Sequence, residues 1–397
     1  MPGTQACALD WVKAYRCSPI TFDHKRFIAS FWRDLVFPNH CAPFGLSTSG
    51  NIQGAPADAF RDILIITLLL CVFKWVDDYN IWRTPTSFTT LPSGEVIYSY
   101  SVSLQDILDL SAPLGVQWHD ISKKGHDFAS ITTYVGFMWD LERKKVYLSE
   151  VKRIKHLRKV HAFLLIAESN TRVNYAVTSS LHGSLQHLCF VYRQGRSYLS
   201  SLSLFTSKFP NKFISHYIPS SVKNDVTWWK RTLSLPSVSR SLIPRTFHDP
   251  DIWVDASEWG IGLVVGDFWA AWKLVPGWRG DGRDMGWAEG LAVEVITLWI
   301  VSDSGIANDA IVKVRSDNTG VIGAHNRGRS RNIHVNDSIR RVSTLFISTN
   351  TTLDFEQVPS ALNRADPISR GDLGPADCKL KISFDLPVEL KEFLVHV

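Results

Sequence analysis

Ile252-Trp253-Val254-Asp255-Ala256-Ser257 is an apolar run that ends in an acid, and the stretch Ala310-Ile311-Val312-Lys313-Val314-Arg315-Ser316-Asp317-Asn318 repeats that pattern. Apolar runs of this length, bounded by turn residues, are typical of buried β-strands. An acid that closes such a run lies where the strand leaves the sheet. The two runs therefore predict a sheet with Asp255 and Asp317 at a shared edge.

The residues around these runs predict the rest of a mixed domain. The segment Trp287–Ile296 predicts a buried helix with Glu289 in its first turns, and Asp366 opens a short helix near the end of the region. The other predicted elements are strands at Ile261–Val265, Phe268–Leu274 and Thr351–Val358, and a helix start at Asn363–Asp366. Residues 251–370 are thus expected to run strand, strand, strand, helix, strand, helices, strand, helix.

Acids at strand ends and helix starts form a candidate metal site. The carboxylates of Asp255, Glu289, Asp317 and Asp366 would repel one another at one sheet edge unless cations lay between them. Two Mg²⁺ ions about 4 Å apart would neutralise the group, activate a water and stabilise the leaving oxygen of a phosphodiester. Hard oxygen ligands favour Mg²⁺, with Mn²⁺ as the alternative ion, over zinc. For Asp317 or Asp366 alone, a helix cap or a solvated surface group is the competing interpretation.

The motifs WVDAS, AEGLAV, VRSDNTG and NRADPISR, in this order, resemble the ribonuclease H domain of retrotransposons over about 250–370. They are most similar to the tyrosine-recombinase (DIRS-like) type. The resemblance implies that Asp255, Glu289, Asp317 and Asp366 are the four metal ligands of the family. Glu294, five residues beyond Glu289, is the second choice for the helix acid.

One position departs from that family. Many members have a histidine just before the proline in the loop after the last strand, where it helps product release. Here Gln357 stands there, before Val358-Pro359. The resemblance then implies slower turnover, unless His325 or His334 takes this role.

The N-terminal third carries a second group of acids. The apolar run Phe73–Trp82 is broken by Asp77 and Asp78, a pattern that predicts a hairpin with both acids at the turn. A solvated turn is the alternative interpretation. Burial of Trp75 and Val76 before the acids, and of Ile81 and Trp82 after them, is expected to give the turn a rigid support. Upstream, Asp10 offers a third carboxylate, and three carboxylates that share two Mg²⁺ ions are what nucleotidyl transfer needs.

Residues of about 5–235 resemble the palm and thumb of a reverse transcriptase. The resemblance implies that Asp10, Asp77 and Asp78 bind metal, and that Tyr15 excludes a ribose 2′-hydroxyl from the nucleotide site. It also implies that Ala42–Gly50, which includes Gly45, positions template and nucleotide, that Tyr134–Phe137 forms the primer-grip hairpin, and that the helix from Val151 starts the thumb.

Three departures from the reverse transcriptase pattern bear on polymerase activity. Only nine residues precede Asp10, so most of the fingers are expected to be missing and the polymerase to be impaired. Trp75 replaces the usual Tyr or Phe, and Gly50 replaces a frequent proline.

A basic helix is predicted after residue 150. Val151, Ile154, Leu157 and Leu165 recur near helical spacing. Basic residues along this helix and the turn before it are candidates for contacts to a nucleic-acid backbone. They are Lys144, Lys145, Lys152, Arg153, Lys155, Arg158 and Lys159. A solvated helix face is the competing interpretation.

Composition is that of a globular intracellular protein. Of the 397 residues 45% are hydrophobic, and the six cysteines form no CxxC pair, which fits a reducing compartment. The net charge of +5 is unevenly distributed along the chain. Residues 1–245 hold 28 Lys/Arg and 17 Asp/Glu, whereas residues 246–397 hold 15 Lys/Arg and 21 Asp/Glu. A basic region joined to an acidic one suggests a polyanion grip beside a carboxylate-rich site. With no signal peptide, and an apolar run at Ile63–Phe73 too short to cross a bilayer, the protein is expected in the nucleus or cytoplasm.

The expected fold is a multidomain α+β and α/β chain. A reverse-transcriptase palm without most of its fingers is predicted over 1–150, and a helical thumb or connection with a linker over 151–245, the linker at Leu233–Pro250. A ribonuclease H-like mixed sheet with flanking helices is predicted over 246–372, and a tail over 373–397. The predicted function is Mg²⁺-dependent hydrolysis of RNA in RNA–DNA hybrids, with RNA template and DNA primer as partners of a weakened polymerase. A catalytically inactive, nucleic-acid-binding relic of a retrotransposon is the main alternative, and a deoxyribonuclease or recombinase built on a similar core is a further one.

Overall fold

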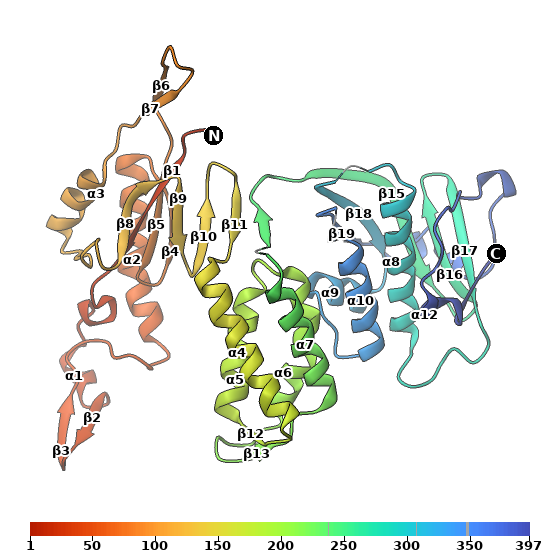
Figure 1. The fold of residues 1–397 in the computed structure, drawn as a ribbon, viewed down its shortest axis with the longest axis horizontal. Helices are drawn as coiled ribbons and strands as arrows, with labels where there is room; N and C mark the ends of the chain where they lie inside the picture. Colours follow the sequence, from red (N-terminus) through yellow and green to blue (C-terminus); the bar gives the residue numbers. More distant parts are fainter. Residues whose placement is uncertain (237, 307, 347–348) are drawn as a thin grey trace. The chain divides into compact units, whose positions relative to one another are not determined.

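The computed structural model describes residues 1–236, 238–306, 308–346 and 349–397 (Figure 1). The chain divides into two compact units. Met1–Glu150 with Ser239–Ile243 form unit 1, and Val151–Val238 with Pro244–Val397 form unit 2. Together they make a mixed α/β multidomain chain, as the sequence predicts.

Unit 1 is built around an antiparallel sheet in the order β4-β5-β1-β8. Its strands are β1 (Gln5–Asp10), β4 (Cys71–Trp75), β5 (Asp78–Arg83) and β8 (Gly125–Ala129). Helix α2 (Ser49–Leu68) packs Phe60 and Leu64 against Tyr79 and Ile81 of β5, and the Tyr79 hydroxyl donates to the Ala57 carbonyl at 2.7 Å. The aromatic and branched residues of β5 therefore anchor the strand that begins at Asp78.

The predicted hairpin at Asp77 and Asp78 is confirmed, but its predicted burial is partly wrong. Strands β4 and β5 pair across a turn at Val76 and Asp77. Trp75 is 67% exposed, whereas Tyr79 and Ile81 are fully buried. Successive residues of a strand face opposite sides of the sheet, so two neighbouring residues cannot both enter the same core.

The remaining elements of unit 1 are short hairpins, helices and a second sheet of order β14-β11-β10-β9. The second sheet contains β9 (Ile131–Tyr134), β10 (Phe137–Asp140), β11 (Lys145–Tyr147) and β14 (Ser239–Ser241). The others are η1 (Ala14–Cys17), α1 (Phe22–Lys25), β2 (Ala29–Trp32), β3 (Leu35–Pro38), β6 (Ser87–Thr90), β7 (Val96–Ser99), α3 (Leu104–Ser111) and η2 (Ala112–Leu114).

The predicted linker at Leu233–Pro250 is only partly a linker. Its first residues end helix α7 (Ser220–Ser234), Ser239–Ser241 form β14, and its last five residues begin a long strand of unit 2. Pro250 did not exclude strand structure, because it lies at an irregularity where the register of that strand shifts between His248 and Ile252.

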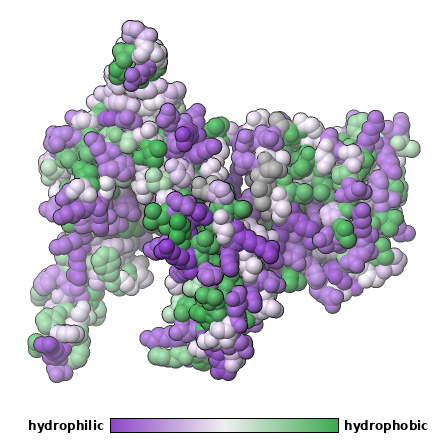
Figure 2. Space-filling view, viewed as in Figure 1, coloured by the Kyte–Doolittle hydropathy of each residue, from purple (hydrophilic) through white to green (hydrophobic). Residues whose placement is uncertain are grey.

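The first part of unit 2 is helical. It contains α4 (Glu150–Glu168), β12 (Val173–Asn174), α5 (Tyr175–Leu188), η3 (Arg193–Leu199), α6 (Ser200–Ser207), β13 (Ser215–His216) and α7 (Ser220–Ser234). Figure 2 shows apolar side chains interspersed with hydrophilic ones over these helices.

Helix α4 confirms the predicted helix after residue 150, but not its predicted apolar face. Val160, Phe163 and Leu164 are buried, whereas Val151 is 80% exposed and Leu165 is 51% exposed. Lys159 Nζ lies 2.7 Å from the Ser180 carbonyl oxygen of α5, which fixes the side of α4 that faces its neighbour. The packing partner, rather than the spacing of apolar residues, decides the buried face.

The second part of unit 2 is a six-stranded mixed sheet in the order β19-β18-β15-β16-β17-β20. The strands are β15 (Thr246–Ala256), β16 (Gly260–Val265), β17 (Phe268–Leu274), β18 (Ala310–Ser316), β19 (Thr352–Gln357) and β20 (Leu394–His396). The helices are α8 (Met285–Ser302), α9 (Thr319–Arg327), α10 (Ile333–Leu345), η4 (Ser360–Leu362), α11 (Asp366–Ser369), η5 (Ala376–Cys378) and α12 (Val388–Lys391).

Strands β15, β18 and β19 run parallel, and β16, β17 and β20 are added antiparallel on the other side of β15. The secondary structure predicted for 251–370 is confirmed in type and order. Residues 373–397, expected as a tail, instead place Leu390 and Leu394 in the core and supply β20. A strand of three residues is too short to show a period in the sequence.

Helix α8 is the core helix of this domain. Every residue from Trp287 to Ile300 is buried against the sheet and helix α10. By length and composition alone α8 could cross a membrane, but 78% of that window is buried inside the fold. Its apolar character is that of a core helix.

A glycine allows α11 to approach the sheet. A Cβ placed on Gly262 of β16 would lie 2.5 Å from the Ser369 backbone nitrogen and 2.6 Å from the Ala365 carbonyl oxygen. Both atoms are backbone atoms, which have no rotamer with which to move away. Only glycine at this position therefore lets α11 lie directly on β16.

We expect Gly262→Ala to lower the free energy of unfolding by about 1–3 kcal/mol, because α11 would be pushed off the sheet. Urea unfolding followed by tryptophan fluorescence measures this. Gly183→Ala is the matched control, since Gly183 lies in α5 with no atom within 4 Å of the added Cβ. That change should be neutral or stabilise by up to about 1 kcal/mol. Equal stability of the two variants would contradict the prediction.

Candidate metal centre

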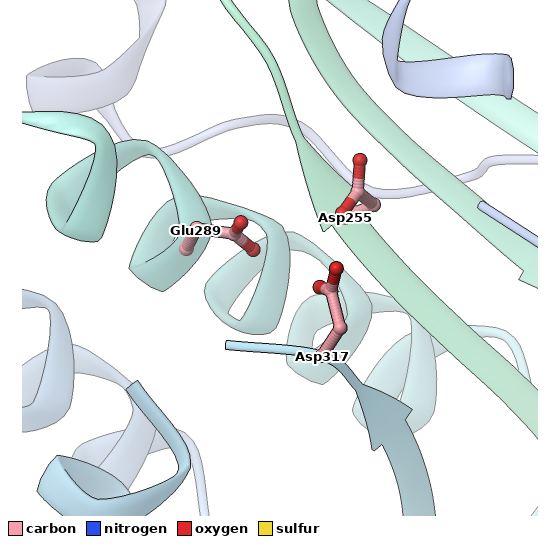
Figure 3. Close-up of side chains that lie close together, drawn as sticks. All are labelled: Asp255, Glu289 and Asp317. Atoms are coloured by element: carbon pink, nitrogen blue, oxygen red, sulfur yellow. The ribbon is translucent and has the colours of Figure 1, made fainter. Parts of the chain in front are cut away.

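Three acids from separate elements meet at one edge of the mixed sheet. Asp255 lies near the end of β15, Asp317 follows the last residue of the parallel strand β18, and Glu289 lies in the second turn of α8. One carboxylate oxygen from each lies within 4.8 Å of the others. Figure 3 shows the three carboxylates turned toward a common space. Asp255 and Glu289 are 3% and 6% exposed, so these charges are gathered in the interior.

Local capping interactions fix the elements that carry these acids. Asp284 caps α8 by accepting a hydrogen bond from the Trp287 N–H at 3.0 Å. Asn318, next to Asp317, caps α9 by accepting from the Val321 N–H at 3.1 Å. An N-cap satisfies backbone donors that a helix start leaves free. Glu289 and Asp317 are thus attached to helix starts that have a defined direction.

Two neutral polar residues support the acids. Asn363 Nδ2 lies 3.2 Å from Asp255 Oδ1 and 3.4 Å from Asp317 Oδ1, so one amide spans both carboxylates. Ser369 Oγ donates to Asp255 Oδ2 at 2.6 Å. Both residues lie in the motif NRADPISR, in which only Asp366 was predicted as a site residue. The sequence feature that could have identified them is their spacing, since each is a hydrogen-bonding side chain three residues from Asp366.

Burial and mutual repulsion shift the titration of this group. Burial, with the charges of Asp317 and Asp366, raises the pKa of Asp255 to about 7, although the Ser369 hydrogen bond opposes the shift. Burial, with the charges of Asp255 and Asp317, raises the pKa of Glu289 to about 8. Glu289 Oε2 is buried and lacks a hydrogen-bond partner. A divalent cation would satisfy this oxygen and offset the repulsion, so the residues fit a metal ion.

Two of the candidate acids lie outside this group. Asp366 is near enough to act on the pKa of Asp255, but its carboxylate is bonded to Arg370 at 2.8 Å. Glu294 is fully buried and holds Arg341 of α10 through contacts of 2.6 and 3.0 Å. Glu294 is therefore an ion-pair residue between two helices, and its nomination as a second choice for the helix acid is wrong.

The two histidines considered for product release differ in their contacts, since His334 has a hydrogen-bond partner and His325 Nε2 has none. His325 is half-buried, its ring centroid lies 5.4 Å from that of Phe355, and burial of the ring lowers its pKa to about 4. His334 Nε2 lies 2.5 Å from the Asp281 carbonyl oxygen. Gln357 ends β19 and is exposed.

The N-terminal acids also come together. Asp10 is paired with Asp78 across β1 and β5, and the Trp11 N–H donates to the Asp77 carbonyl at 2.9 Å. Burial, followed by the charges of Asp77 and Asp10, raises the pKa of Asp78. Within the described ranges, these three acids do not form a group as tight as that of Asp255, Glu289 and Asp317.

Two basic side chains that were not predicted from the sequence lie at Asp10. His119 Nε2 lies 3.3 Å from Asp10 Oδ1, and Lys124 Nζ lies 3.4 Å from Asp10 Oδ2. Both lie more than a hundred residues further along the chain and follow no periodic pattern. The pairing of β1 with β8, the bridge between Trp11 and Trp118, and a hydrogen bond from the His119 N–H to the Asp10 carbonyl at 2.9 Å bring that part of the chain to Asp10.

Tyr15 lies in η1, and Gly45 lies in the loop between β3 and α2. The Tyr15 ring packs against the Phe44 ring with a centroid distance of 4.9 Å. Gly45 has φ +90°, a backbone conformation that favours glycine, shortly before helix α2. Their assignment to nucleotide binding stays a prediction.

The basic residues predicted to contact a nucleic-acid backbone divide into two groups. Arg153 donates to the carbonyls of Leu233 and Leu235, the latter at 3.2 Å, and Lys159 is bonded to Ser180 and Ser184. These two residues therefore hold helices together. The other basic residues lie at the surface. Lys144, Lys145, Lys155 and Arg158 are exposed, and Lys152 is half-buried. Residues 151–245 hold fifteen Lys/Arg and only two acids, Glu168 and Asp225, so this segment is strongly basic.

No family profile matches the sequence, and no curated protein matches it. Among solved structures, the chain is similar to a foamy viral protease-reverse transcriptase in complex with an RNA/DNA hybrid, with a TM-score of 0.42, 13% identity, and coverage of 96% of this chain and 47% of that one. Two further structures of that protein with double-stranded DNA have TM-scores of 0.40 and 0.36 and identities of 12% and 13%. They cover 89% and 90% of this chain, and 57% and 68% of theirs. The chain thus spans about half the length of the first of these structures.

We expect the metal-free protein to lose stability as pH rises from about 4 to about 8. In this window folded Asp255 and Glu289 still hold protons, because their pKa values are about 7 and about 8, while the unfolded chain has released them near 3.8 and 4.5. The unfolded state binds fewer protons there, so the free energy of unfolding falls with rising pH, by at least about 1 kcal/mol. Urea unfolding in EDTA across this range measures the fall, and Mg²⁺ should restore stability at the upper end.

Glu289→Gln should flatten this pH dependence, since the amide does not ionise. Glu258→Gln is the control, because Glu258 is exposed and pairs with Arg279 away from the three acids. A wild-type protein whose stability rises through the same window would contradict the assigned shifts.

Proposed function

We propose that this chain is a metal-dependent nuclease of the ribonuclease H type that cleaves the RNA strand of RNA–DNA hybrids, joined to a reverse-transcriptase palm. The observation that supports it best is the meeting of Asp255, Glu289 and Asp317 at the edge of a mixed sheet, with Glu289 Oε2 left without a partner. A group of buried acids without a bound cation is costly to a fold, so its presence points to chemistry rather than to stability.

Each residue of the site has a distinct task in this proposal. Asp255, Glu289 and Asp317 would hold Mg²⁺, which supplies an activated water and stabilises the leaving oxygen when it is bound. Asn363 keeps Asp255 and Asp317 at a fixed separation. Ser369 orients the second oxygen of Asp255. Cleavage is expected to leave 3′-hydroxyl and 5′-phosphate ends.

A nucleic-acid substrate fits the charge distribution of unit 2. The acids attract cations but repel phosphates, so a polyanion needs positive charge elsewhere on the same body. The segment 151–245 supplies that charge, and it is tied to the sheet domain through Arg340 of α10, which lies 2.6 Å from Asp225 of α7. Recognition would rest on phosphates and helix shape rather than on base sequence.

We further propose that the palm retains the acids of a polymerase with little activity. Asp10, Asp77 and Asp78 lie at one end of the β1–β5 pair, as two-metal nucleotidyl transfer needs. However, both oxygens of Asp10 are approached by basic groups, His119 and Lys124, which would compete with a metal ion. The assignment of the element to the DIRS-like type, and the domain boundaries at 150, 245 and 372, belong to this proposal.

We expect Asp317→Asn to reduce Mg²⁺-dependent cleavage of a labelled RNA–DNA hybrid at least about 100-fold. Loss of a residue that only hydrogen-bonds to a metal ligand typically reduces activity about 10- to 100-fold, and loss of a ligand itself should cost more. Denaturing gel analysis of the RNA strand measures this. Asp354→Asn serves as the matched control, because Asp354 is an exposed acid of the neighbouring strand β19. Cleavage at the same rate by wild type and Asp317→Asn would remove the nuclease proposal and favour an inactive, nucleic-acid-binding relic.

Primer extension on an RNA template should give little or no product with the wild-type chain. The reason is that Lys124 pairs with Asp10 Oδ2 and would compete with a metal ion for it, although Asp10 Oδ1 accepts no hydrogen bond. Asp78→Asn provides the background level, and hybrid cleavage by the same preparation shows that the protein is folded. Extension well above the Asp78→Asn level would show that the polymerase site is functional.

A further inference from the structure

Asp366 is held by an arginine one helical turn further along the chain. Arg370 Nε lies 3.0 Å from both carboxylate oxygens of Asp366, and Nη2 lies 2.8 Å from Oδ1. The backbone fixes this spacing, since the Arg370 N–H donates to the Asp366 carbonyl at 3.2 Å. Of the four acids predicted as ligands, Asp366 is the one whose two oxygens both contact a cation of the chain itself.

Arg370 lies close enough to the other acids to affect them. Its bond to Asp366, and then the charges of Asp255 and Asp317, raise the pKa of the guanidinium. The side chain is nevertheless 66% exposed, and that of Asp366 is 30% exposed. An ion pair open to solvent exchanges its partners readily, unlike one enclosed by the fold. Arg370 can therefore leave Asp366 without disturbing the core.

We propose that Arg370 competes with the second divalent ion for Asp366, so that the metal centre fills in two steps. This inference rests on the nuclease function proposed above. The first ion binds at Asp255, Glu289 and Asp317, where a buried oxygen lacks a partner. A second ion reaches Asp366 only after the guanidinium has left, because both of them need the same oxygens and because they repel each other. Arg370 thus sets the concentration of metal at which the centre is complete.

Metal binding can be measured separately from cleavage. Mn²⁺ is titrated into the full chain, and the electron paramagnetic resonance signal of the free ion reports how much is bound. The wild-type protein should bind Mn²⁺ in a strong and a weak class. Arg370→Gln should tighten the weak class roughly tenfold, the usual scale for removing one charge at contact distance. The strong class should change by less than about twofold, and Arg370→Lys should lie between the two proteins.

Two variants distinguish this competition from a general charge effect. Arg364→Gln removes the same charge six residues earlier, but Arg364 pairs with Asp251 outside the three acids, so the weak class should stay as in wild type. Asp366→Asn should abolish the weak class and keep the strong one. Equal tightening by Arg364→Gln and Arg370→Gln, or an unchanged weak class in Arg370→Gln, would overturn the inference.

The same titration separates this inference from the proposed function. If Asp317→Asn loses the strong class while Arg370→Gln binds as wild type does, the metal centre stands and the competition is refuted. If wild type and Asp317→Asn bind Mn²⁺ equally, no ion binds at the three acids, and both the nuclease proposal and the two-step filling are refuted. Thermal unfolding of each variant shows whether a change in binding reflects loss of the fold.

Discussion

Repulsion among three carboxylates, of which those of Asp255 and Glu289 are buried and that of Asp317 is half-buried, is the constraint on which unit 2 depends. Like charges at contact distance in a medium of low polarity either take up protons or require a counter-charge. Asp255 and Glu289 respond with raised pKa values, while Asn363 and Ser369 hold the aspartate oxygens without neutralising them. The rest of the domain resists the separation of these acids. Parallel pairing of β15 with β18 keeps Asp255 near Asp317, and the burial of α8 from Trp287 to Ile300 holds Glu289 at the same edge with 6% exposure.

The sheet and most of its acids could be predicted because parallel core strands read as continuous apolar runs. The choice between Glu289 and Glu294 could not be made from this pattern. Five residues turn a helix by about 140°, so the two glutamates point to different neighbours, but both are buried and both lie in an apolar segment. Only the position of Arg341 on α10, which pairs with Glu294, decides which acid is left for the sheet edge. The pairing of Asp366 with Arg370 was harder still to predict, because Arg370 lies four residues further along the chain and is exposed.

In unit 1 and the helical segment, the sequence predicted where strands and helices lie better than it predicted which side of each is buried. The hairpin acids were found, yet Trp75 is exposed because alternation along β4 directs Val72 and Lys74 to the other side of the sheet. Helix α4 was predicted, but basic and apolar residues are mixed all around it, so the sequence did not show which side of the helix is buried. Lys159 illustrates the difficulty, since a lysine that resembles a phosphate contact is used to hold two serines of α5. Long basic side chains can serve packing as well as binding.

Two adjacent arginines connect the basic helices to the acids. Arg340 contacts Asp225 of α7 and the Ser197 carbonyl, and its guanidinium lies 4.4 Å from the centre of the Tyr198 ring. Arg341, the next residue of α10, holds Glu294 of α8. Helix α8 also carries Glu289, so a displacement of α7 that moved α10 would be transmitted to the acid cluster. The segment expected to grip nucleic acid and the residues expected to cleave it are therefore joined through one helix. On this view, Arg340 and Arg341 matter to the site although neither faces its centre, because they fix the helix against which α8 is placed.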